Sequence, residues 1–180
     1  MNAPLVLTLF RILSIPVLVI VLLTPFNGQH VTSFVIFLIA ILTDMLDGFW
    51  ARRKKQITVI GQLLDPTADK LLIVSVMICL VGAGVMPSWM AIVIIGREIA
   101  VTGFRAIASS RGINIPASVL GKIKMISEST TIALLLLGAD VLGRYYVLSR
   151  IGLWITVAAA VVSGAEYYFR YGRQVLSGQA

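Results

Sequence analysis

The chain has 180 residues and a net charge of +7; 58% of its residues are hydrophobic and only 13% are charged. Soluble domains carry about 25% charged residues, so this composition excludes an ordinary soluble domain and indicates an integral membrane protein. At about 20 residues for each spanning helix, the length leaves room for roughly six or seven spans and for no separate soluble domain.

Apolar segments separated by polar turns predict six spanning helices in chain order. We expect them at about residues 5–23, 31–50, 59–81, 88–109, 119–137 and 151–169. Proline and glycine mark the turns, as at Pro25 and Gly28 after the first helix and at Gly84 and Pro87 after the third. The sequence therefore predicts one all-α domain over residues 1–180. This domain would be an integral membrane bundle of six transmembrane helices with a polar cavity that faces the cytoplasm.

Basic residues distinguish the two sides of the predicted bundle. Most of them lie in or beside segments on the side of the N-terminus, including the run at residues 52–55, whereas the opposite loops hold only Arg144 and Arg150. The positive-inside rule then places both termini in the cytoplasm. We expect a multi-pass protein of the cell's inner (cytoplasmic) membrane. The positive charge is explained by this topology and by attraction to anionic lipid, so we expect no nucleic acid partner.

Four of the eight acidic residues lie close together in the sequence, at Asp44, Asp47, Asp65 and Asp69. A carboxylate among apolar residues at a membrane is costly unless something compensates its charge, and four together repel one another. On a helix the first two are about 60° apart, and the last two are one turn apart. Two helix ends can thus present four carboxylates to each other. Divalent metal is the compensation we expect, because hard cations prefer oxygen ligands.

Small and basic residues share the helix faces of these aspartates. Gly48, Ala51 and Gly61 would let a ligand or another backbone approach closely. Arg52 is a planar, permanently charged donor that suits phosphate. The alternative is a set of interfacial acids neutralised by nearby Arg and Lys, which would explain one aspartate better than four at these spacings.

The two segments read D-x-x-D-G-x-x-A-R and G-x-x-x-D-x-x-x-D, and this pattern resembles the signature of the CDP-alcohol phosphatidyltransferase family at every fixed position. The resemblance implies attack of an acceptor hydroxyl on the β-phosphorus of a CDP-linked lipid, with CMP as the leaving group. It implies two divalent cations, Mg or Mn, a homodimer, and Asp69 as general base and further metal ligand beside Asp44, Asp47 and Asp65. It also implies contacts with the CDP-lipid at Gly48, Ala51, Arg52, Thr58 and Gly61.

Three further segments narrow the resemblance. The N-terminal N-A-P-L-V-L-T-L-F-R-I-L, G-R-E-I-A-V-T-G-F-R at residues 96–105 and G-K-I-K at residues 121–124 resemble the branch of the family that makes phosphatidylglycerophosphate. This implies CDP-diacylglycerol and sn-glycerol 3-phosphate as substrates. Arg105, Lys122 and Lys124 could hold the phosphate of the acceptor, because a dianion needs several cations. Topology is the alternative explanation of these three charges.

Two positions depart from that branch, which usually has Thr and Gln where this chain has Met125 and Glu128. Glu128 could repel the acceptor phosphate or hold Lys124 through an i, i+4 pair, and we favour the pair. In the same region Arg97 lies mid-span, where a charge is costly. It could pair with its neighbour Glu98, or it could favour an anionic acceptor.

Two other functions stay open. The same chemistry could use another acceptor, such as phosphatidylglycerol in cardiolipin synthesis or inositol phosphate. A divalent-cation transporter would use the aspartates as a transport site, but transport favours ionisable groups near the bilayer midplane. The predicted position at a cytoplasmic edge beside an Arg-Lys run therefore favours the enzyme.

Overall fold

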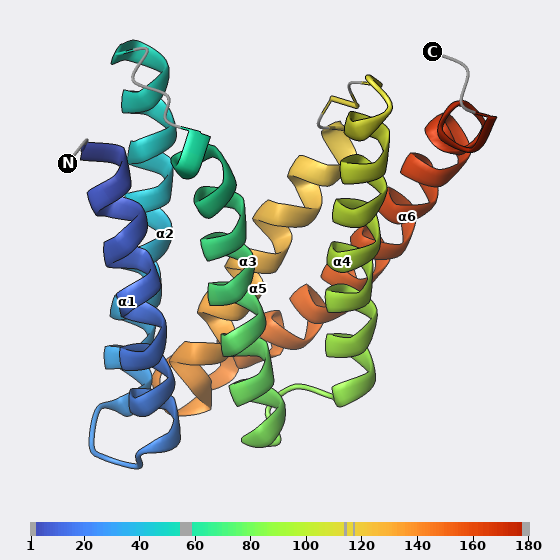
Figure 1. Ribbon diagram of the computed structural model, residues 1–180. Helices are drawn as coiled ribbons and strands as arrows, with labels where there is room; N and C mark the ends of the chain where they lie inside the picture. The colour runs from blue at the N-terminus through green and yellow to red at the C-terminus, as the bar shows by residue number, and fades with distance from the viewer. Residues whose placement is uncertain (1–2, 55–58, 114, 117, 178–180) are drawn as a thin grey trace. The chain divides into compact units, whose positions relative to one another are not determined.

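The computed structural model describes residues 3–54, 59–113, 115–116 and 118–177. Within these residues it describes every side chain except those at 3–7, 44–54, 59–66 and 176–177. The described chain is helical and contains no strand, which confirms the all-α prediction. The helices are α1 (Ala3–Leu23), α2 (Gln29–Lys54), α3 (Val59–Gly82), α4 (Ser88–Ser110), α5 (Val119–Leu142), the 3-10 helix η1 (Gly143–Tyr146) and α6 (Val147–Ser177) (Figure 1).

By length and composition, one helical stretch of the described chain is apolar enough to cross a membrane. It lies within Val119–Val175, with a mean hydropathy of 1.7, while Thr8–Leu23 and Gln29–Thr43 are shorter apolar helices. By its contacts the chain forms two compact units. Unit 1 comprises Met1–Val85 and Ile132–Tyr146, and unit 2 comprises Met86–Thr131 and Val147–Ala180.

In unit 1, α1 packs against both α2 and α3 (Figure 1). Apolar side chains fill these contacts, and Leu18, Phe37 and Leu72 are each at most 2% exposed. The amide of Gln29, the first residue of α2, donates to the carbonyls of Val21 and Leu22 at 3.1 and 2.8 Å. These bonds satisfy carbonyls that the end of α1 leaves without helical partners, so Gln29 fixes the turn between α1 and α2.

Helix α5 breaks at Gly138, whose φ of 68° and ψ of 174° are not helical. The residue has to be glycine, because a Cβ there would lie 2.9 Å from Nδ1 of His30. The same ring nitrogen lies 3.0 Å from the carbonyl oxygen of Leu136. The predicted end of this helix, residue 137, directly precedes the break, and four more residues follow Gly138 within α5.

In unit 2, α4 packs against α6 (Figure 1). Trp89 and Trp154 join these helices, with ring centroids 5.5 Å apart. A second apolar cluster contains Ala108, Ile115, Tyr167 and Val175.

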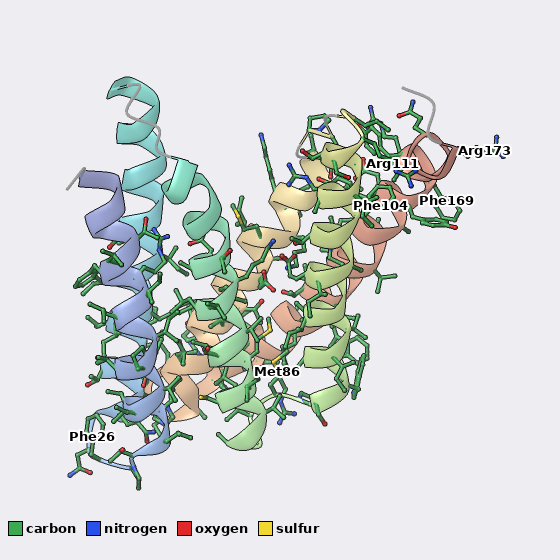
Figure 2. All side chains as sticks on the ribbon, viewed as in Figure 1. Phe26, Met86, Phe104, Arg111, Phe169 and Arg173 are labelled. Carbon is green, nitrogen blue, oxygen red and sulfur yellow. The ribbon has the colours of Figure 1, made fainter. Side chains whose placement is uncertain are left out.

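Gly112, with a φ of 76°, ends α4, and the amide of Ile113 bonds to the carbonyl of Ala108 at 2.9 Å, as in a Schellman motif. Arg111 at this turn donates to the carbonyl of Val175 near the C-terminal end of α6 (Figure 2). The start of the loop that precedes α5 is therefore tied to both α4 and α6.

Candidate functional site

The structure describes the side chain of Asp69, the predicted general base. It lies on α3, and its carboxylate Oδ1 is 2.9 Å from Nη1 of Arg11 on α1. The Asp69 side chain is 39% exposed, whereas that of Arg11 is only 1% exposed. The buried guanidinium of Arg11 therefore holds the carboxylate of Asp69, and the exposed part of the carboxylate is accessible to a ligand.

The other predicted metal ligands are placed by their backbone. Positions 44 and 47 lie on α2, and position 65 lies one turn before Asp69 on α3. The side chains of Asp44, Asp47 and Asp65 lie outside the described set. The same holds for Gly48, Ala51 and Arg52 on α2 and Gly61 on α3, and Thr58 lies outside the described residues.

The pairing of α1 with both α2 and α3 brings the two motif helices to one common neighbour. Thr8 and Arg11 lie three residues apart on α1 and are 0% and 1% exposed. Residues three apart occupy the same helix face, so α1 presents a buried polar stripe within this three-helix group. Arg11 is among the basic residues on the side of the N-terminus that topology alone would explain. Its position inside an apolar segment was the available signal for burial.

A second cluster of charged side chains lies in unit 2, around Lys124 on α5. The ammonium of Lys124 lies 2.5 Å from Glu98 on α4 and 2.8 Å from Glu128, one turn further along α5. Arg97 pairs with Glu98 at 2.7 Å and donates from Nε to the hydroxyl of Ser163 on α6 at 3.1 Å. The predicted pairs Arg97–Glu98 and Lys124–Glu128 are confirmed.

Burial makes this cluster unusual. Lys124 is 1% exposed and Glu128 is 4% exposed. Buried charges are stable only when they are paired and hydrogen-bonded, and the two carboxylates supply two partners for the three N–H donors of the ammonium. Formally the charges of Arg97, Glu98, Lys124 and Glu128 cancel, so the cluster as a whole is neutral.

The other two predicted acceptor residues are exposed. Arg105 on α4 donates from Nη2 to the carbonyl of Ile115 at 3.2 Å, which leaves its charge uncompensated by that contact. Lys122 lies in the first turn of α5, where the hydroxyl of Ser118 caps the helix by accepting from the amide of Gly121 at 3.0 Å. Of the three predicted cations, the structure thus joins Lys124 to carboxylates and leaves Arg105 and Lys122 at the surface of unit 2.

The region around Asp69 in unit 1 and the basic residues of unit 2 suit different kinds of ligand. In unit 1 an accessible carboxylate on α3 can ligate a cation or accept a proton. In unit 2 exposed basic side chains beside a helix N-terminus can attract an anion, since helix N-termini favour negative charge.

Comparison with known proteins gives the family. The family model for CDP-alcohol phosphatidyltransferase matches residues 1–162. The chain is 38% identical to the CDP-diacylglycerol–glycerol-3-phosphate 3-phosphatidyltransferase of Bacillus subtilis (strain 168), over 93% of each chain. It is 31% identical to the protein of that name from Rickettsia felis, over 93% of each chain.

A third relative of the same name, from Salmonella choleraesuis, is 35% identical over 85% of this chain and 90% of its own. The matches run through residues of both compact units, so the similarity is not confined to the aspartate motif. The chain belongs to the CDP-alcohol phosphatidyltransferase family.

Proposed function

We propose that this chain transfers a phosphatidyl group from CDP-diacylglycerol to sn-glycerol 3-phosphate, giving phosphatidylglycerophosphate and CMP. The observation that carries the proposal is the family membership, together with relatives named for this reaction that are 31–38% identical over most of their length. The intact motif from Asp44 to Asp69 and the accessible carboxylate of Asp69 support the same chemistry.

In the proposed reaction the acceptor hydroxyl attacks the β-phosphorus, the bond from that phosphorus to CMP breaks, and the hydroxyl proton passes to Asp69. Asp44, Asp47, Asp65 and Asp69 would hold two divalent cations, Mg or Mn. Their carboxylate oxygens are the donors that such cations prefer. When bound, the cations would neutralise charge on the diphosphate. Contacts with the CDP-lipid would come from the remaining motif positions Gly48, Ala51, Arg52, Thr58 and Gly61.

The acceptor phosphate would be bound by Arg105, Lys122 and Lys124. Because the cluster around Lys124 is formally neutral, most of the attraction for a dianion would come from Arg105 and Lys122. Lys124 would add one directed N–H donor, since its two carboxylate partners account for the other two. The exposed positive charges of Arg105 and Lys122 support an anionic acceptor over a neutral alcohol.

We further propose one membrane domain over residues 1–180, with six spans, a polar cavity open to the cytoplasm, and both termini cytoplasmic in the inner membrane. Six helices separated by loops of unequal basic charge support this arrangement. Membrane lipid would surround the bundle, and two copies would form a homodimer, as the family resemblance implies.

Release of CMP tests the proposal. The purified protein is mixed with CDP-diacylglycerol and Mn²⁺ in lipid–detergent micelles, with sn-glycerol 3-phosphate, phosphatidylglycerol, inositol phosphate or no acceptor. We expect CMP only with sn-glycerol 3-phosphate. CMP release with another acceptor would overturn the substrate but keep the reaction. Divalent-cation flux into proteoliposomes without CMP release would support a transporter instead.

A further inference from the structure

Arg11 is a charged side chain whose burial the topology of the membrane does not explain. It lies on α1 and is 1% exposed, among the largest fully buried side chains of the described chain. A cation that only orients a protein in the membrane acts at the surface. Moving a guanidinium out of water is costly unless a charged partner and good geometry compensate it, so this burial requires a specific interaction.

One such interaction is the ion pair with Asp69. Nη1 of Arg11 lies 2.9 Å from Oδ1 of Asp69, which is a close ion-pair contact. The guanidinium reaches across from α1 to α3, two helices that pack against each other in unit 1. Because a guanidinium is permanently charged, this close contact holds Oδ1 of the carboxylate beside α1 and stabilises its charge.

The two side chains of this ion pair differ in how far they are exposed. Asp69 is 39% exposed, and Arg11 is almost wholly covered. A ligand can therefore approach the carboxylate but not the guanidinium. In this arrangement a buried cation holds a functional carboxylate through an ion pair, and the cation does not itself touch the ligand.

We infer that Arg11 is a positioning residue that holds the carboxylate of Asp69 in its working orientation. The inference rests on the proposed function, in which Asp69 takes the acceptor proton and ligates metal. Partners that orient a functional or metal-binding carboxylate typically contribute about 10- to 100-fold to activity or metal affinity. A lysine at position 11 would keep the charge but lose the planar fork, so it would replace Arg11 only in part.

The first test is the kinetics of Arg11→Lys and Arg11→Gln. We expect kcat for CMP release to fall by about 10- to 100-fold in Arg11→Gln and by less in Arg11→Lys. The KM values for CDP-diacylglycerol and sn-glycerol 3-phosphate should stay unchanged in both variants. Arg170→Gln is the matched control, because Arg170 also pairs with a carboxylate, Glu166 at 3.8 Å, but is 65% exposed. It should behave as the wild type.

The second test does not depend on turnover. Mn²⁺ binding without substrate is titrated by electron paramagnetic resonance for the wild type, Arg11→Gln, Asp69→Asn and the double variant. Because Arg11 acts through Asp69, the double variant should bind Mn²⁺ with the same affinity as Asp69→Asn. The affinity of Arg11→Gln, which keeps the carboxylate, should not fall below that of Asp69→Asn. The double variant replaces the ion pair by two amides, so it avoids a buried guanidinium without this carboxylate if Asp69→Asn does not fold.

Two results would overturn the inference. One is wild-type kcat in Arg11→Lys and Arg11→Gln; the other is a Mn²⁺ affinity that falls further in the double variant than in Asp69→Asn. Failure of the proposed function is distinguishable from both. If the wild type uses another acceptor, the same kinetic comparison is made with that acceptor, and the Mn²⁺ titration is unaffected.

Discussion

The carboxylate of Glu128 lies 2.8 Å from the ammonium of Lys124, one turn earlier on the same helix, and both side chains are at most 4% exposed. Lys124 has a second carboxylate partner in Glu98, which is itself paired with Arg97. In the described contacts Glu128 has only Lys124 as an ion-pair partner. The two acids therefore depend on Lys124 to different degrees, and this difference can be tested.

Lys124→Met should destabilise the protein by about 3–5 kcal/mol, because it leaves the buried carboxylate of Glu128 without its partner. Adding Glu128→Gln to this variant should restore most of the loss, since Glu98 keeps Arg97. Thermal unfolding in detergent measures both effects. Lys122→Gln is the matched control, because Lys122 is exposed on the same helix turn, and its Tm should match the wild type. Equal stability of Lys124→Met and Lys122→Gln would contradict the pairing.

Glu128→Gln alone should raise the KM for sn-glycerol 3-phosphate and leave that for CDP-diacylglycerol unchanged. The carboxylate holds the ammonium of Lys124 in place, and an uncharged amide holds it less firmly. Steady-state kinetics with each substrate varied in turn measures the difference. A lower KM for sn-glycerol 3-phosphate would mean instead that the negative charge of Glu128 opposes the acceptor phosphate.

Asp69→Asn should abolish turnover and leave binding of CDP-diacylglycerol largely intact, because Asp69 faces the acceptor in the proposed reaction. Asp44→Asn should weaken binding of Mn²⁺ and of CDP-diacylglycerol together, because both depend on the metal ligands. Equilibrium binding of a fluorescent CDP-lipid, measured with and without Mn²⁺, separates the two variants. Near-normal release of CMP by Asp69→Asn would remove the general-base assignment.

Gly152→Ala should destabilise unit 2 by about 1–3 kcal/mol, as overpacking of a tight contact does. A Cβ at position 152 would lie 2.5 Å from Oγ1 of Thr131. That hydroxyl cannot move away easily, because it is buried and lies 3.1 Å from the hydroxyl of Thr156. The Tm of the variant in detergent measures the cost.

Two comparisons control this prediction. Gly103→Ala places a Cβ with no atom within 4 Å among the described residues, so it should be neutral or slightly stabilising, since alanine favours helix more than glycine does. Gly152→Ala with Thr131→Ala should recover part of the loss. If Gly152→Ala and Gly103→Ala have the same Tm, the contact between α5 and α6 at Thr131 is not tight.

Hydrophobic segments and turn residues were sufficient to predict the helices. All six were expected within a few residues of their observed starts, and the largest differences lie at the ends of α2, α5 and α6. Charged and aromatic residues at those ends look like the edge of a span, although the backbone continues as helix through them. The short helix η1 was missed, because four residues have too little periodicity to give a signal.

Within the candidate sites, local pairs were predictable and distant ones were not. The Lys124–Glu128 pair follows from i, i+4 spacing, and Arg97–Glu98 from adjacency. The link from Lys124 to Glu98 joins α5 to α4, and that from Arg11 to Asp69 joins α1 to α3. Such contacts depend on which helix faces meet, and a single sequence carries no pattern for that choice.

The contact between Trp89 and Trp154 makes intrinsic tryptophan fluorescence a probe of the packing of α4 against α6. These are two of only three tryptophans in the chain, and indole rings whose centroids lie 5.5 Å apart influence each other's emission. Because one ring comes from α4 and the other from α6, separation of these helices would change the fluorescence. Replacing the third tryptophan by Trp50→Phe would leave a signal that comes from this pair alone, so loss of the α4–α6 contact could be timed without an attached dye.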